Sequence, residues 1–189
     1  MNHVLSAESK GIRIRPLMER DIESLRNWRN DKENAMYLNR IPYVTIDLQH
    51  KWYKNYCGNE NEITFAIEHY GEMVGSVSIY NFADNTFEYG KIMIGEKKKR
   101  GLGIGYKSVV LAMHIGFAIG KYRECLCSVH ENNEPGMVLE KRIGFTEYNR
   151  HRFESGGYEF EMKIAREDFY EKNEWVKDVL IVRYDNDGD

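Results

Sequence analysis

The chain contains few of the residues that cross-link or restrict a fold: three cysteines and three prolines occur among 189 residues. The cysteines, Cys57, Cys125 and Cys127, are odd in number, and the Cys-x-Cys pair has neither zinc nor thioredoxin spacing. We therefore expect no disulfide framework and no cysteine metal site. A reducing cytoplasm is the simplest location for such a chain.

The sequence also lacks long apolar runs and an excess of basic charge. No run approaches the ~20 apolar residues that a membrane-spanning helix needs, and the opening MNHVLSAESKGIRIRP has no apolar signal segment. The 27 Lys and Arg residues against 30 Asp and Glu residues give a net charge of -3. Since no global positive field attracts nucleic acid, we expect a protein that binds neither membranes nor nucleic acid.

Internal repeats and Pro- or Gly-rich linkers are absent as well. With 42% hydrophobic residues, the chain is long enough for one sizeable core and short for two ordinary domains. We therefore predict a single domain at residues 1–165. A charged C-terminal extension follows at 166–189, and we expect its last residues to be disordered.

What the chain does contain is a basic, glycine-spaced loop between Phe87 and Tyr106, FEYGKIMIGEKKKRGLGIGY. Its first part, up to Ile94, mixes aromatic and β-branched residues as a strand does, and 107–119 is a proline-free apolar run of helical length. Alternating glycines let a backbone approach a ligand closely, and the first amides of a helix are unpaired, so this loop can hold phosphate. An ordinary glycine turn before a helix is the alternative explanation.

The glycine spacing excludes two common nucleotide loops. A dinucleotide fingerprint requires G-x-G-x-x-G, whereas Gly105 follows Gly103 one position early. A triphosphate loop requires Gly-Lys-Ser/Thr, whereas Tyr106 separates Gly105 from Lys107. The string that begins at Arg100 instead reads R-x-x-G-x-G and resembles the pyrophosphate loop of the GNAT superfamily of N-acetyltransferases. This resemblance implies that the ligand is acetyl-CoA.

The remaining pattern predicts an α/β (α+β) chain with a mixed, mostly antiparallel central sheet flanked by helices, in an order similar to that of GNAT enzymes. Asp21 and Thr45 are placed to cap the first two helices. Asn133 and Gly144 are placed to begin and end a later short one. The predicted strands are 11–16, 62–68, 73–80, 87–94, 124–130, 146–152 and 158–164. The predicted helices are 21–30, one that starts after 45, 107–119 and, after a turn, a short one within 131–142. Of the remaining segments, 33–44 is predicted to be irregular, 166–174 to be helical and 176–184 to be a strand or a docked tail.

Two further strings carry the GNAT resemblance. One runs from Asn133 through VLEK to Ile143-Gly144-Phe145 and looks like the family's Asn…Gly-Phe element, in the form found in enzymes that act on ribosomal-protein N-termini. The other is IRIRPLMERDIESLRNWRND with the later QHKWY, which is similar to a branch of amino-sugar, ribosomal-protein and polyamine acetyltransferases. Together the matches span residues 12–164.

The resemblance implies particular cofactor-binding residues. Loop amides would bind the pyrophosphate, the strand backbone of Ile92, Met93 and Ile94 would hold the pantetheine arm and polarise the thioester oxygen, and Asn133 would bond the cofactor from the next helix. For residues 92–94 the alternative is an ordinary core strand, and for Asn133 it is a plain helix cap. If the loop binds the cofactor, the neighbouring lysines at 97–99 and 107 attract its phosphates. The alternative is that these lysines are a run of solvated surface charges. The implied loop residues are Arg100, Gly101, Leu102, Gly103, Ile104, Gly105 and Tyr106.

Glu88 is the predicted catalytic base, because many relatives carry a glutamate facing the acceptor at this strand position. The alternative for Glu88 is an ordinary surface side chain that pairs with a neighbouring strand. His130 is a second candidate proton carrier, but a lone histidine at a strand end more often has a structural role. The chain departs from the family at Glu140, where many relatives place the tyrosine that protonates the leaving thiolate. The general acid therefore stays open between water, the acylated amine and three tyrosines chosen by side-chain chemistry alone, Tyr106, Tyr148 and Tyr158.

The expected activity is transfer of an acetyl group from acetyl-CoA, as co-substrate, to a primary amine. A nucleotide-linked amino sugar is the preferred acceptor because of the RNWRN and QHKWY strings, followed by a ribosomal-protein N-terminus and then a polyamine. A non-catalytic acyl-CoA-binding module is the alternative that the missing tyrosine motivates. An exposed edge strand would allow a homodimer.

Overall fold

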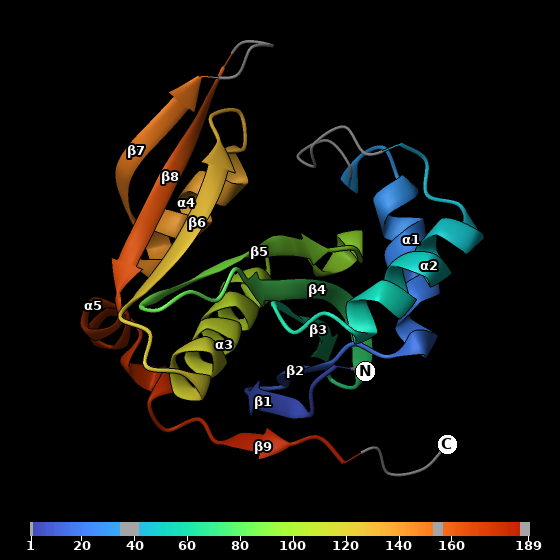
Figure 1. Ribbon diagram of the computed structural model, residues 1–189, viewed down its shortest axis with the longest axis horizontal. Coiled ribbons are helices and arrows are strands. Elements are labelled where there is room, and N and C mark those ends of the chain that lie inside the picture. Colours follow the sequence, from blue (N-terminus) through green and yellow to red (C-terminus); the bar gives the residue numbers. More distant parts are fainter. Residues whose placement is uncertain (1, 35–41, 153–156, 186–189) are drawn as a thin grey trace.

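The computed structural model describes residues 2–34, 42–152 and 157–185, which form a mixed sheet flanked by helices (Figure 1). Within these residues the sheet has nine strands in the order β7-β8-β6-β5-β4-β3-β2-β1-β9, and β5–β6 is its one parallel pair. The predicted fold class is confirmed. The strands are β1 (Leu5–Ser9), β2 (Ile12–Pro16), β3 (Glu62–His69), β4 (Glu72–Tyr80), β5 (Thr86–Ile94), β6 (Glu124–His130), β7 (Thr146–Arg152), β8 (Tyr158–Ala165) and β9 (Ile181–Arg183).

Five α-helices and short 3-10 turns connect the described strands. The helices are α1 (Ile22–Asn30), α2 (Ile46–Cys57), α3 (Ile104–Ile119), α4 (Glu134–Ile143) and α5 (Arg166–Lys172), and the turns are η1 (Glu19–Asp21), η3 (Lys97–Lys99) and η4 (Glu174–Val176). Residues 35–41, in the segment predicted to be irregular, and 153–156, in the turn predicted before Gly157, lie outside the described residues.

Helix α3 lies across one face of the sheet and supplies the centre of the core (Figure 1). Its apolar side chains from Val109 to Phe117 are buried, which fits the proline-free apolar run in the sequence. A Cβ at Gly116 would lie 2.5 Å from the ring of Phe87 on β5, so the helix and the sheet can approach this closely only because residue 116 is glycine. The close packing fixes the C-terminal part of α3 against the beginning of β5.

Strand β1 was not predicted from the sequence. It pairs with β2 through a turn in which Lys10 (φ 51) and Gly11 (φ 74) both adopt the left-handed conformation that tight hairpin turns require. Its other edge pairs with β9, so the C-terminal segment closes this side of the sheet. The pattern LSAES has little alternation of its own, and the strand is stabilised by these two neighbours.

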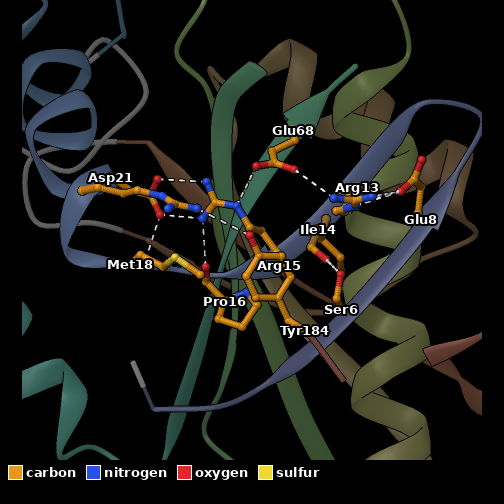
Figure 2. Close-up of polar contacts among 11 residues, drawn as sticks. Ser6, Glu8, Arg13, Ile14, Arg15, Pro16, Met18, Asp21, Glu68 and Tyr184 are labelled. Atoms are coloured by element: carbon orange, nitrogen blue, oxygen red, sulfur yellow. Dashed lines mark hydrogen bonds and ion pairs between the residues drawn. The ribbon is translucent and has the colours of Figure 1, made fainter. Parts of the chain in front are cut away.

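The predicted capping role of Asp21 is wrong for α1, because its side chain makes no cap hydrogen bond to that helix. Its carboxylate binds the guanidinium of Arg15 on β2 at 2.6 Å and 3.0 Å, and it also accepts from the amide of Met18 at 2.8 Å (Figure 2). A buried arginine that needs a partner outcompetes the helix N-terminus for this carboxylate. Thr45 and Asn133, in contrast, do accept from amides in the first turns of α2 and α4.

The Arg15 ion cluster consists of Arg15, Asp21 and Glu68, of which Arg15 is 3% exposed and Asp21 4% exposed. Glu68 on β3 accepts from Arg15 Nε at 2.6 Å, and the Pro16 carbonyl accepts from Nη1 at 3.0 Å. Burial works against the charge, but the hydrogen bonds that Arg15 donates to both carboxylates raise its pKa above the ordinary value. The cluster ties β2 and β3 to the entry of α1 (Figure 2).

The described part of the predicted C-terminal extension packs against the domain. Phe169 of α5 and Val176 of η4 are fully buried, and the side-chain amide of Asn173 donates to the carbonyl of Ile143 at 3.0 Å. The hydroxyl of Tyr106 on α3 donates to Asn173 Oδ1 at 2.7 Å. Residues 166–184 therefore hold the ends of α3 and α4 in place.

We expect Arg15→Leu to lower the free energy of unfolding by about 3–5 kcal/mol, because it leaves the buried Asp21 carboxylate without a cation and Glu68 with only the more distant Arg13. Arg13→Leu is the matched control on the same strand. Arg13 also pairs with Glu68, but its side chain is 46% exposed, so we expect a loss below about 1 kcal/mol. Urea denaturation of both variants measures the difference, and equal losses would contradict the role of the cluster.

Candidate active site

The candidate site begins where strands β5 and β6 part. Their parallel pairing covers only Thr86–Glu88 against Glu124–Leu126, whereas β6 stays paired with β8 along its length. Figure 1 shows β6, β7 and β8 diverging together from β5 beyond this point. Among the described strands, none occupies the β6 side of Tyr89–Ile94. We call this parting of the two strands, as their backbone pairing defines it, the β5–β6 cleft.

A β-bulge lies on β5 inside the cleft. Ser78 pairs with Gly90 and Ser76 with Met93, so Val77 faces both Lys91 and Ile92. Lys91 adopts φ 53, an unusual conformation for a residue other than glycine. Bulges re-aim backbone groups beside active sites, and this one lies next to the three residues predicted to hold the pantetheine arm.

The predicted phosphate loop joins the end of β5 to the start of α3. Gly101 and Gly103 both have φ 76, and nothing lies within 4 Å of the positions where their Cβ atoms would be. The amides of residues 101–106 make no hydrogen bond to another described residue. Unpaired amides at the positive end of a helix dipole form an anion site, so the loop fits a diphosphate.

Arg100 is the exception among the predicted loop donors. Its amide donates to the carbonyl of Lys97 at 3.2 Å, and its side chain donates to Ile94, Glu33 and Asn34. Lys97 is likewise held by Asp31 at 3.2 Å and Glu33 at 2.7 Å. Both cations therefore fix the loop to the segment after α1, and the unpaired donors lie in the glycine backbone that follows.

Asn133 lies across the cleft at the start of α4. Its Oδ1 accepts from the amide of Gly136 at 3.0 Å, so the predicted helix cap is present. Its Nδ2 makes no hydrogen bond to a described residue. The cap and a contact to a ligand are therefore compatible.

Glu88 is the last residue of β5 that pairs with β6, and it lies on the face opposite to the buried Phe87 and Tyr89. Its carboxylate accepts from Asn81 Nδ2 at 3.1 Å, and it pairs across the sheet with Tyr80. Burial and the nearby Glu88 charge raise the pKa of Tyr80 above its ordinary value. A half-buried carboxylate at the apex of the cleft suits the predicted base.

The other predicted proton carriers lie elsewhere or have structural roles. Nδ1 of His130 accepts from the amide of Asn132 at 3.1 Å. The Tyr106 hydroxyl binds Asn173. Tyr148 is 48% exposed and Tyr158 39% exposed on the outer strands.

Sequence reasoning missed a buried cluster on the α3 and α4 side of the cleft. Glu140 of α4 is 4% exposed and lies beside Tyr89 of β5 and Cys127 of β6. Burial raises the pKa of Glu140 to about 7, although hydrogen bonding from Tyr89 and Cys127 works in the opposite direction. Cys125, Cys127 and Val129 alternate along β6 and are buried, but the alternation alone does not reveal that Glu140 lies against this face.

Helices α1 and α2 cover the sheet on the Glu88 side, near the bulge (Figure 1). The guanidinium of Arg29 on α1 lies 5.1 Å from the ring of Trp52 on α2, and burial lowers its pKa. In the described residues Arg29 forms no ion pair, since Glu62 is taken by Lys91 at 2.7 Å. This wall combines an aromatic surface with an unpaired cation.

Two features are absent from the described residues: a cluster of metal-ligating side chains and a membrane-spanning helix. No group of three or more His, Cys, Asp or Glu side chains among them could hold a metal ion. In the same residues, no helix has both the length and the apolar character needed to cross a membrane.

A sheet that parts beside a helix N-terminus with unpaired amides suits a protein that binds an extended, phosphorylated carrier. A family model described as an acetyltransferase (GNAT) domain matches residues 12–146. The chain belongs to the GNAT acetyltransferases, enzymes that use acetyl-CoA as co-substrate. The expected family and co-substrate are confirmed.

Individual proteins show the same relationship. N-acetyltransferase 9-like protein of Caenorhabditis briggsae is 23% identical over 137 residues, covering 66% of this chain and 69% of that protein. Spermidine N-acetyltransferase from Vibrio cholerae, in complex with CoA and spermine, aligns with a TM-score of 0.75 at 20% identity, covering 85% of this chain and 99% of that chain. A domain from Methanocaldococcus jannaschii aligns with a TM-score of 0.70 at 24% identity, covering 84% and 99%. The structural likenesses establish the fold.

We expect Gly103→Val to weaken CoA binding by roughly 100-fold, because a side chain would fill the open space over the loop. A loss of this size corresponds to about two charge-assisted hydrogen bonds. Isothermal titration with CoA measures the affinity. Gly71→Val is the matched control: Gly71 also has a positive φ, 84, with nothing within 4 Å of its Cβ position, but it lies in the β3–β4 turn. An equal loss of affinity in both variants would contradict the loop assignment.

Proposed function

We propose that this chain transfers the acetyl group of acetyl-CoA to a primary amine, with the amides of residues 101–106 holding the diphosphate. The proposal is carried by one observation: these amides are unpaired in the described structure and lead directly into the β5–β6 cleft. The acetyl thioester supplies the activated acyl group when bound. Every other requirement falls to the protein.

The backbone of Ile92, Met93 and Ile94 follows the bulge and is proposed to line the cleft beside the pantetheine arm. An amide aimed at the thioester oxygen would stabilise the negative charge that develops there. Asn133 is proposed to donate from Nδ2 across the cleft. In this arrangement the carrier lies between β5 and α4, and its thioester lies near the apex.

Glu88 is proposed as the general base that removes a proton from the acceptor ammonium, directly or through water. Its position at the apex of the cleft supports this role, because the thioester is proposed to lie near the apex as well. Its hydrogen bond from Asn81 orients the carboxylate. The amine is thereby held and deprotonated on the face that α1 and α2 cover.

The acceptor is proposed to be a nucleotide-linked amino sugar. Arg29 supports this choice, because an unpaired guanidinium beside Trp52 attracts a phosphate or an aromatic ring and repels a polycation. A protein N-terminus is the second candidate. A polyamine is the third, although the V. cholerae neighbour is a spermidine N-acetyltransferase.

We further propose a cytoplasmic protein, which suits its three free cysteines. A homodimer through β7 is compatible with the exposure of all its residues on an edge of the sheet. Both are secondary to the activity.

A panel of amines assayed by release of the free thiol of CoA tests the function. We expect turnover with a nucleotide-linked amino sugar to exceed turnover with spermidine, and Arg29→Gln to reduce the preference by roughly tenfold. Tight CoA binding with no acetylation of any amine would favour a non-catalytic acyl-CoA-binding module instead. Preferred acetylation of spermidine would reject the acceptor assignment alone.

We expect Glu88→Gln to reduce kcat by about 100-fold, because glutamine cannot accept the proton of the acceptor. Asn81→Ala is a companion variant that removes only the orienting hydrogen bond and should cost less. Equal rates for Glu88→Gln and the wild type across the pH range would remove Glu88 from the mechanism.

A further inference from the structure

Two carboxylates flank the apex of the β5–β6 cleft from opposite faces of the sheet. Glu88 and Leu126 are the last residues at which β5 and β6 pair, and Glu88 lies on the face that α1 and α2 cover. The next residues, Tyr89 and Cys127, are buried on the other face, where Glu140 of α4 lies beside both. A group that enters the cleft to the point of parting would therefore meet Glu88 on one side and the Glu140 cluster on the other.

The polar atoms of this cluster contact one another only loosely. Glu140 Oε2 and the Tyr89 hydroxyl are buried, and neither forms a hydrogen bond of normal geometry within the described part of the chain. Native proteins rarely leave such atoms poorly satisfied, since an unsatisfied buried group costs stability. Helix α4 needs only an apolar side chain to pack here, so a buried carboxyl at this position points to a role toward something that binds in the cleft.

The surroundings of Glu140 favour its neutral form. Tyr89 on β5 and Cys125 and Cys127 on β6 face it, and burial raises the pKa of all three, so they stay protonated near neutral pH. The described groups around Glu140 include no cation that would hold it ionised. Glu140 is therefore the member of the cluster that can lose a proton near neutrality.

We propose that the Glu140 carboxylic acid donates its proton to the sulfur that leaves during acetyl transfer; this inference rests on the proposed function. The amine nitrogen forms a bond to the carbonyl carbon, the carbon–sulfur bond breaks, and the sulfur takes both bonding electrons together with the Glu140 proton. The acceptor ammonium loses two protons: Glu88 passes the first to solvent before attack and takes the second as the amide forms. Glu88 then releases this second proton to solvent and Glu140 regains one from it when the products leave, so atoms and charges balance.

Opposite faces suit the two proton transfers. The amine approaches from the face that α1 and α2 cover, where Glu88 lies, and the sulfur departs toward the face of α4, where Glu140 lies. Because the pairing of β5 and β6 separates the two carboxylates, the acid and the base keep different surroundings. The base remains half-exposed and the acid remains buried.

Glu140→Gln tests the proposal, because glutamine keeps the size of the side chain and cannot give up a proton. We expect kcat to fall by about 100-fold with CoA affinity unchanged. The difference from wild type should be largest at acid pH and narrow above neutrality, where wild-type Glu140 is ionised. Glu134→Gln, an exposed glutamate in the first turn of the same helix, is the matched control.

The leaving group provides a second readout. An acetyl thioester of 4-nitrothiophenol releases a thiolate that needs no proton, whereas the thioester of N-acetylcysteamine releases a basic one. We expect Glu140→Gln to be impaired at least tenfold more with the basic leaving group. Equal impairment with both esters, or a pH profile parallel to that of wild type, would show that Glu140 only supports the structure and would overturn the proposal.

A third measurement does not depend on the acceptor. Infrared difference spectra of the protein with CoA and with desulfo-CoA, which lacks the thiol, should show a carboxylic acid band that responds to the sulfur in wild type and is absent in Glu140→Gln. A band insensitive to the sulfur would reject the inference while leaving the acetyltransferase function intact. Failure of CoA itself to bind would reject both.

Discussion

The short parallel pairing of β5 and β6 is the constraint on which the site depends. The two strands share only Thr86–Glu88 and Glu124–Leu126 before they separate. The pairing fixes the apex of the cleft and the faces on which Glu88 and Glu140 lie. The separation leaves the β5 backbone next to the bulge without a strand partner on its β6 side. The core around helix α3 contains side chains from strands on both sides of the parting, and the Arg15 ion cluster fixes β2 and β3 within one of these halves.

Features with local causes could be predicted from the sequence. The loop between β5 and α3 depends on glycines with positive φ, and such residues are visible as a string. Thr45, Asn133 and Gly144 end or begin helices through contacts a few residues away. The fold class and most strands followed from alternation within each segment. These are short-range effects, so spacing was sufficient to find them.

Features set by contacts between distant segments could not be predicted. Strand β1 is stabilised by β2 and β9, and Asp21 is taken from its helix by Arg15. The sequence placed Glu140 at the position of a missing tyrosine, but its burial depends on how α4 meets β5 and β6. The bulge at Lys91 likewise exists only relative to β4. Each required knowledge of a neighbour many residues away.

The ion pairs of Lys97 and Arg100 with Asp31 and Glu33 connect the cofactor loop to the end of α1, the helix that carries Arg29. These pairs couple the two elements energetically. A change that stabilises one position of the loop must alter the end of α1, and the reverse effect has the same free energy.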